Sequence, residues 1–159
     1  MDTAHRSYWE ISEVVFGIPF LVSLGLQWLI PLSLPQGILQ QALIPVGSAL
    51  IVVGLGFIVL ARREFARYRQ SMEPGRAIST IVQTGVFSLS RNPLYLGIAL
   101  TLSGLALVLN VLWILMMLIP ALMLCHIVLI TPEERYLKHK FGQEYLAYAA
   151  SVRRWLGRK

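Results

Sequence analysis

Charge and cysteine are both scarce in this chain. Only 14% of its 159 residues are charged, whereas a soluble domain carries about 25%. Its single cysteine, Cys125, excludes a disulfide within the chain. One cysteine and three histidines also provide no ligand set with the spacing of a metal site, so the sequence predicts no bound metal. The composition therefore does not indicate a small soluble protein built around a metal or a disulfide framework.

Charge is missing altogether from two long stretches, residues 14–61 and 92–132, and 56% of the chain is hydrophobic. One bilayer-spanning helix needs about 20 apolar residues. Each stretch is therefore long enough for two spans and a tight turn, which predicts an all-α integral membrane protein with four transmembrane helices arranged as two hairpins. The predicted spans are about 14–31, 43–60, 94–109 and 111–130. The turns are expected between Pro31 and Gly37 and at Asn110.

The basic residues lie outside these stretches. The net charge is +6, and of the 14 Lys and Arg residues, six lie in 62–91 and seven in 135–159. By the positive-inside rule, the N-terminus, the central loop and the C-terminus all face the cytoplasm, and four spans also require both termini on one side. We expect a protein of a bacterial inner membrane. The distribution favours contact with anionic lipids over nucleic acid as a partner.

We expect residues 1–159 to form a single membrane domain. The cytoplasmic loop, residues 62–92, begins as a basic extension of the second span. It then becomes too apolar to hang free in water and is expected to lie back on the bundle. Residues 132–155 have an aromatic and apolar stripe at three- and four-residue steps, which predicts an amphipathic C-terminal helix that Gly142 breaks in two.

Two polar blocks border the second charge-free stretch. One is Ser90–Gly97, with Arg91, Asn92, Pro93 and Tyr95, and the other starts at Thr131 and includes Glu133 and Glu134. A charge cluster at a membrane boundary is costly unless it binds or caps something. Because the two ends of one hairpin can meet in space, the blocks together predict a site at the membrane–water interface.

Each polar block also has a purely structural interpretation. Asn92 and Pro93 are typical of a helix start, and Arg91 of a snorkelling membrane anchor. Thr131, Pro132 and Glu134 have the spacing of a capping box.

The spans themselves contain three further candidates. His126 precedes Glu133 by seven residues and so falls on nearly the same face of an α-helix, although it can equally be a histidine bonded to a neighbouring helix. Gly54 and Gly56 are typical of close helix packing, and they lack the strand–turn–helix context of a nucleotide-binding loop.

The order of these residues resembles a known family of membrane enzymes. The pattern is Thr84-Gly85-x-Phe87-x-x-Ser90-Arg91-Asn92-Pro93-x-Tyr95-x-Gly97, followed by Glu133-Glu134-Arg135-x-Leu137-x-x-x-Phe141-Gly142-x-x-Tyr145-x-x-Tyr148-x-x-x-Val152-x-Arg154. It resembles the isoprenylcysteine carboxyl methyltransferase family, and phospholipid methyltransferases such as phosphatidylethanolamine N-methyltransferase are similar in pattern. The resemblance implies an integral-membrane methyltransferase, an enzyme of class EC 2.1.1, that uses S-adenosyl-L-methionine as cofactor without a Rossmann domain.

The resemblance also implies roles for particular residues. Gly54, Gly56, Glu133 and Glu134 match a Gly-x-Gly and a Glu-Glu that are associated with cofactor binding in the phospholipid enzymes. In the Arg-His-Pro-x-Tyr motif of the isoprenylcysteine enzymes, Asn92 of this chain replaces the histidine. Asn92, Pro93 and His126 are further candidates for the cofactor site. The catalytic candidates are Arg91, which can hold an anionic acceptor, and Tyr95, whose ring can face the sulfonium as a cation–π partner.

Two other classes remain open. A related hydrophobic hairpin closes the sterol reductases, which would make this chain an NADPH-dependent membrane reductase, and a non-enzymatic membrane scaffold is the third possibility. The methyl acceptor also stays open among a lipid amine, a lipid-linked carboxylate and a small hydrophobic thiol. We expect the acceptor to enter from the bilayer.

Overall fold

The computed structural model describes residues 8–68 and 80–159, and regular structure in this part of the chain is helical. The elements are α1 (Tyr8–Leu29), α2 (Ile38–Arg67), η1 (Gly85–Ser88), α3 (Pro93–Leu109), α4 (Leu112–Cys125), η2 (His126–Ile130), α5 (Thr131–Phe141) and α6 (Gln143–Ser151). The short η1 is a 3-10 helix, and η2 is a π-helix. The predicted all-α class is confirmed.

Three of the helices are long and apolar enough to cross a membrane. They are Ser12–Leu29 within α1, Ile38–Arg67, and the continuous helix Leu112–Phe141 that α4, η2 and α5 form together. A further helix, α3, is apolar but has only 17 residues. Large apolar side chains on the outside of the bundle stay exposed, as those of lipid-facing helices do. These helices support an integral membrane protein, while the count of four spans stays a prediction.

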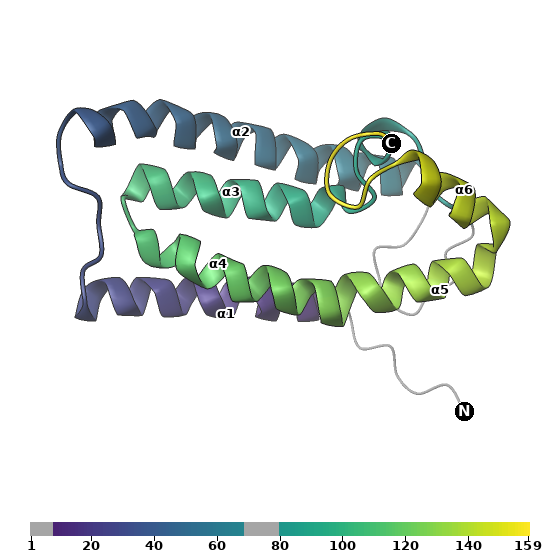
Figure 1. The fold of residues 1–159 in the computed structure, drawn as a ribbon, viewed down its shortest axis with the longest axis horizontal. Helices are drawn as coiled ribbons and strands as arrows, with labels where there is room; N and C mark the ends of the chain where they lie inside the picture. The colour runs from purple at the N-terminus through teal and green to yellow at the C-terminus, as the bar shows by residue number, and fades with distance from the viewer. Residues whose placement is uncertain (1–7, 69–79) are drawn as a thin grey trace.

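The helices pack side by side in the order α2, α3, α4, α1 (Figure 1). Asn110, with a φ of 56°, makes the turn between α3 and α4, so the predicted second hairpin is confirmed. The prediction that α1 and α2 form the first hairpin is wrong, because α1 packs on α4 and α2 packs on α3. Residues 30–37 can reach about 25 Å when extended, which is enough to cross the end of the bundle.

Four glycines let α2 and α3 approach closely. Gly54 faces Gly97, and Gly47 faces Gly104 one step of seven residues along each helix. A Cβ atom added at Gly54 would lie 2.6 Å from the carbonyl oxygen of Gly97, and one added at Gly104 would meet the carbonyl oxygen of Gly47. Small residues at such a contact are typical of membrane helices, since packing rather than water exclusion drives their association.

The predicted capping box at Thr131 is wrong. The helix continues without interruption from α4 through η2 into α5, and Thr131 has helical backbone angles (φ −64°, ψ −44°). Its hydroxyl donates to the carbonyl of His126 at 2.8 Å instead of capping a helix start. Proline lacks a backbone N–H, and its ring crowds the carbonyl four residues earlier. The wider π turn directly before Pro132 gives that carbonyl room, so the helix passes the proline unbroken.

Neutral hydrogen bonds close the end of the bundle where α1 joins α2 (left in Figure 1). The Asn110 side chain accepts from the N–H of Leu34 at 2.8 Å and donates to the carbonyl of the same residue at 3.0 Å. The indole N–H of Trp113 donates to the carbonyl of Ile30 at 2.8 Å. The segment that joins α1 to α2 is therefore hydrogen-bonded to the turn between α3 and α4.

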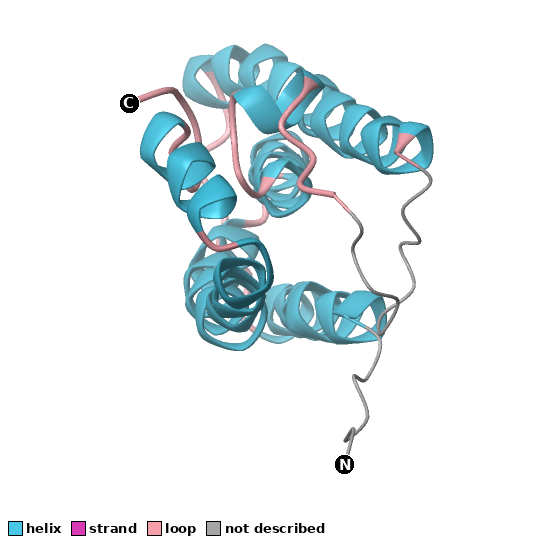
Figure 2. Cartoon of the chain, turned by 90° about the vertical axis from the view of Figure 1, so that its right-hand side faces the viewer, coloured by secondary structure: helices cyan, strands magenta, loops and turns pink. Residues whose placement is uncertain are grey.

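The C-terminal segment forms two helices and a returning tail instead of one helix over 132–155. Gly142 breaks the helix as predicted, with a φ of 55°. Helix α6 ends at Ser151, and Val152 is already extended. Residues 152–159 then fold back at the end of the bundle that holds α5 and α6 (Figure 2). Gly157 makes this reversal possible because its φ of 103° is costly for any other residue.

The predicted loop, residues 62–92, continues α2 as far as Arg67 and packs on the bundle over residues 80–92. Val82, Val86 and Phe87 are buried against Ala61 of α2. The stripe on α5 and α6 packs on the same loop, because Ile81 joins a buried cluster with Tyr145, Tyr148 and Val152. The remainder of the predicted basic extension and loop, residues 69–79, lies outside the described residues.

Candidate functional site

The two polar blocks meet at the end of the bundle that carries α5 and α6. Nη1 of Arg91, just before α3, lies 3.0 Å from Oε1 of Glu134 in the first turn of α5. These residues are 43 positions apart and are joined only through the α3–α4 hairpin. The sequence prediction that the ends of this hairpin come together is confirmed.

Glu134 binds a second guanidinium, which the tail contributes. Nε of Arg154 donates to Oε1 of Glu134 at 3.0 Å, and Nη2 donates to Oε2 at 2.7 Å. This two-point geometry is the strong form of an arginine–carboxylate pair. The hydrogen bond to Glu134 raises the pKa of Arg154, so this guanidinium stays charged. One carboxylate thus neutralises only one of two arginines, and the trio keeps a net positive charge.

Arg91 is held in place but not fully satisfied. Its side chain is 11% exposed, and its Nη1 also donates to the hydroxyl of Tyr145 at 3.1 Å. Burial raises the pKa of Tyr145, which keeps the phenol neutral and able to accept this bond. The Nε atom of Arg91 is buried and has no hydrogen-bond partner among the described residues. A buried donor without a partner is costly, and at such a position it is a candidate for ligand contact.

Asn92 and Pro93 are at the start of α3, as the sequence predicted, with Pro93 in the first turn. The Asn92 side chain makes no cap, however, and its Nδ2 instead donates to the carbonyl of Arg154 at 3.1 Å. Both residues are buried. This arrangement places Asn92 beside the Arg91–Glu134 pair and ties it to the same tail residue that holds Glu134.

Glu133 differs from its neighbour Glu134. It is partly buried in the first turn of α5, yet no hydrogen bond or ion pair is found for its carboxylate within residues 12–68 and 80–159. A carboxylate that is partly shielded from water and has no partner can take up a cation or a hydrogen-bond donor. The structure thus separates the two adjacent acids into one that is fully engaged and one that is available.

The candidates Tyr95 and His126 lie deeper along the bundle. Tyr95 is 7% exposed and stacks on Phe16 of α1, with ring centroids 6.5 Å apart. His126 begins the π turn, and such a turn holds more residues than an α-helical turn. The spacing of seven residues therefore does not place His126 and Glu133 on one helix face by the α-helical rule.

The two glycines of the predicted Gly-x-Gly pair have different surroundings. Gly54 is buried in the contact with α3, where added atoms would collide with Gly97 and Thr101. Gly56 is partly exposed, and a Cβ atom there would meet nothing within 4 Å. Gly54 therefore has a packing role, whatever else the pair does.

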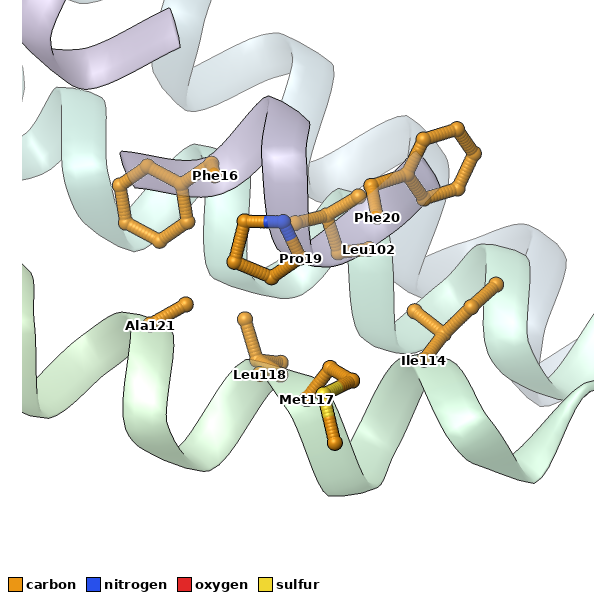
Figure 3. A pocket seen from close by; sticks show the side chains of 8 residues that line it. All are labelled: Phe16, Pro19, Phe20, Leu102, Ile114, Met117, Leu118 and Ala121. Carbon is orange, nitrogen blue, oxygen red and sulfur yellow. The ribbon is translucent and has the colours of Figure 1, made fainter. Parts of the chain in front are cut away.

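A small apolar cavity lies between α1, α3 and α4 (Figure 3). Its volume is about 10 Å³, and its lining is apolar throughout, with Phe16, Leu118 and Ala121 among its walls. Ligand sites for drug-sized molecules measure about 300–1,000 Å³. This cavity is accordingly a packing defect and not a candidate site for a nucleoside cofactor. No cluster of three potential metal ligands occurs within the part of the chain that the structure describes.

Sequence reasoning missed two members of the cluster. Tyr145 is one of the aromatic residues of the stripe predicted over 132–155, yet its hydroxyl accepts a hydrogen bond from Arg91. Arg154 falls within the helix predicted over 132–155, but that helix ends at Ser151. The available signal for both was their place in the pattern Tyr145-x-x-Tyr148-x-x-x-Val152-x-Arg154, which resembles that of the methyltransferase family, since amphipathic periodicity alone does not single them out.

Comparison with known families gives a match to the phospholipid methyltransferase family over residues 43–144. The match includes Gly54, Arg91 and both glutamates, and it ends before Arg154. No curated protein and no solved structure matches the chain. The matched segment exceeds half of the sequence and contains both polar blocks of the charged cluster. This chain therefore belongs to the phospholipid methyltransferase family of membrane methyltransferases.

Proposed function

We propose that this protein is an S-adenosylmethionine-dependent methyltransferase that works at the membrane–water interface. The acceptor would be a lipid-linked or small hydrophobic molecule with a carboxylate, amine or thiol, as in the enzymes that resemble isoprenylcysteine carboxyl methyltransferase. The observation that carries the proposal is the Arg91–Glu134 pair, in which both polar blocks of a methyltransferase-family sequence meet at the charged end of an apolar bundle.

The residues at this end fit the charges of the cofactor. Glu133 has a carboxylate without a described partner, which suits the ammonium of the methionyl group. Bound S-adenosylmethionine would supply a methyl group on a sulfonium. Asn92, Pro93 and His126 are the further cofactor candidates, and Glu134 contributes by keeping Arg91 and Arg154 in place beside them. For the Gly54 and Gly56 pair, only Gly56 has open space in front of it.

Arg91 is proposed to orient the acceptor. Its Nε atom has an unused hydrogen-bonding capacity, and the two arginines around one glutamate leave a positive charge. An anionic group of the acceptor would meet both requirements. A carboxylate or thiolate acceptor is already nucleophilic, so the protein has to position it and exclude water. Orientation of this kind can lower a barrier by about 7–11 kcal/mol.

Tyr95 is proposed to contribute by shaping the apolar side of the site. It lies in the hydrophobic core that α1 and α4 share, stacked on Phe16. Its ring is an electron-rich surface of the type that attracts a sulfonium. The methyl acceptor would approach from the bilayer along this apolar side, while the polar cofactor would enter from the aqueous side.

We propose that the charged end faces the cytoplasm, with four spans and both termini on that side. Arg63 and Arg67 at the end of α2 and Lys138 and Lys140 on α5 are all exposed. Basic residues of this kind retain a membrane end on the cytoplasmic side. Cysteine labelling on a Cys125→Ser background tests the orientation: a cysteine at Gln36 should react from outside the cell and one at Lys140 should not. The reverse pattern would overturn the topology.

A cofactor titration tests the function. The detergent-solubilised protein is titrated calorimetrically with S-adenosylmethionine and, separately, with NADPH. Binding of S-adenosylmethionine alone, followed by transfer of radiolabelled methyl groups to lipids extracted from membranes, is the expected result. Binding of NADPH alone would favour a reductase related to the sterol reductases, and binding of neither would favour a scaffold. Either outcome would overturn the proposal.

A further inference from the structure

We propose that Arg154 is a positioning residue that joins the two halves of the charged site, where the cofactor and the acceptor meet, a role that rests on the proposed function above. One half is the segment before α3, with Arg91 and Asn92. The other is the first turn of α5, with Glu133 and Glu134. Arg154 belongs to neither half: it follows α6 in the returning tail and lies outside the segment that matches the family.

Two parts of Arg154 contact the two halves. Its guanidinium holds both oxygens of Glu134, at 3.0 Å and 2.7 Å. Its backbone carbonyl accepts from Nδ2 of Asn92 at 3.1 Å. The neighbouring carbonyl, that of Arg153, accepts from the N–H of Arg91 at 3.1 Å. A single turn of the tail thus connects Arg91, Asn92 and Glu134, but not Glu133.

The tail is itself fixed, which makes it suitable as a clamp. The N–H of Gly157 donates to the carbonyl of Leu89 at 2.7 Å, and the N–H of Arg153 donates to the carbonyl of Gly157 at 2.8 Å. Val152 pairs with Arg158 in an antiparallel bridge. The guanidinium of Arg154 therefore extends from an ordered backbone and sets the direction of the Glu134 carboxylate.

The geometry requires an arginine at this position. Two parallel N–H donors match the two oxygens of Glu134, whereas a lysine ammonium is a single point charge that fixes no orientation. If Arg154 is lost, Glu134 keeps Arg91 as its partner but is free to turn. The site then has to be ordered again when the cofactor binds, and that ordering lowers affinity.

Arg153 offers a matched control. It is the adjacent residue and of the same type, its side chain is exposed, and no contact of its guanidinium is found within the described residues. Substituting its side chain leaves its backbone carbonyl, and so the bond to Arg91, in place. A general effect of charge on the tail would appear in both positions, whereas the proposed role concerns Arg154 alone.

The test is calorimetric titration of S-adenosylmethionine into detergent-solubilised wild type, Arg154→Ala, Arg154→Lys and Arg153→Ala, with melting curves of each. We expect both Arg154 variants to bind about tenfold more weakly, since charged hydrogen bonds are lost, and Arg153→Ala to bind as wild type. Guanidinium ions, added well below denaturing concentrations, should restore much of the affinity of Arg154→Ala. They should leave the affinity of wild type unchanged.

The alternative outcomes are distinct. Wild-type affinity in Arg154→Lys would overturn the proposed positioning role, because charge without orientation would then suffice. A loss of affinity in Arg154→Ala that guanidinium does not restore, together with a lowered melting temperature, would reduce Arg154 to a structural residue. If wild type itself fails to bind S-adenosylmethionine, the proposed function fails, and this role fails with it.

Discussion

The two ends of the bundle both carry polar side chains, and they use them differently. At the end near residues 30–37, the amide oxygen and nitrogen of Asn110 both form hydrogen bonds with the backbone of Leu34, and the indole N–H of Trp113 donates to the carbonyl of Ile30. These bonds are neutral and mutually complete. At the other end, Arg91 keeps a buried Nε without a described partner and Glu133 keeps a carboxylate without one.

This difference distinguishes an end whose hydrogen bonds only stabilise the fold from an end that can bind a ligand. Buried polar groups are nearly always paired, so a group that remains unpaired calls for an explanation of its own. The end held by Asn110 is explained by the need to join two connections. The charged end has an unused donor on the positive Arg91 and an unused acceptor on the negative Glu133, as expected where a zwitterionic ligand binds. The comparison predicts that substitutions at one end change stability alone and that those at the other also change binding.

The largest effect is expected between the two ends, at Gly54. Gly54→Leu would press a side chain into the backbone of Gly97 and Thr101, and overpacking of this kind costs about 3 kcal/mol or more in a contact that cannot yield. Thermal unfolding in detergent should show a large fall. Gly56→Ala is the matched control, since nothing lies within 4 Å of the added atom. A normal melting temperature for Gly54→Leu would contradict the packing role.

A smaller effect on stability is expected at Glu134. Glu134→Gln removes the charge that holds Arg91 and Arg154 together, and the loss of such charged hydrogen bonds costs about 1–3 kcal/mol. Both the melting temperature and the affinity for S-adenosylmethionine should decrease. If melting is unchanged while binding is lost, Glu134 contacts the cofactor directly and is not mainly an anchor for the arginines.

The smallest of these changes is expected at the opposite end. Asn110→Ala removes two hydrogen bonds to Leu34 and should lower stability by about 1–2 kcal/mol. Its affinity for S-adenosylmethionine should stay at the wild-type value, which titration under conditions where the variant is folded can check. Weaker binding by the folded variant would show that the two ends are coupled and would break the distinction between them.

The sequence predicted the elements that depend on local composition and periodicity. The absence of charge predicted the helical stretches. Asn110 predicted the tight turn between α3 and α4, and Gly142 predicted the break before α6. The meeting of Arg91 and Glu134 was also predictable, because one hairpin must bring its own ends together. These features follow from covalent neighbours and from the length of a span.

The packing between residues that are far apart in the chain could not be predicted from the sequence. Nothing in residues 30–37 shows that they cross the bundle, since the same residues can form a tight turn. A capping box and a π turn share the residues Thr131 and Pro132, and only the helix preceding them decides between the two. The role of Arg154 depends on a tail that reverses at Gly157, so amphipathic spacing placed it on the wrong element.

Titration of Glu133→Gln tests the central claim most directly. Glutamine keeps the size of the side chain and removes only the negative charge, and Glu133 has no described partner whose loss would destabilise the fold. The account predicts a wild-type melting temperature and an affinity for S-adenosylmethionine that is weaker by at least about tenfold, equivalent to about 1.4 kcal/mol. An unchanged affinity in this variant would contradict the claim that the unpaired carboxylate at the charged end is where the cofactor's ammonium binds.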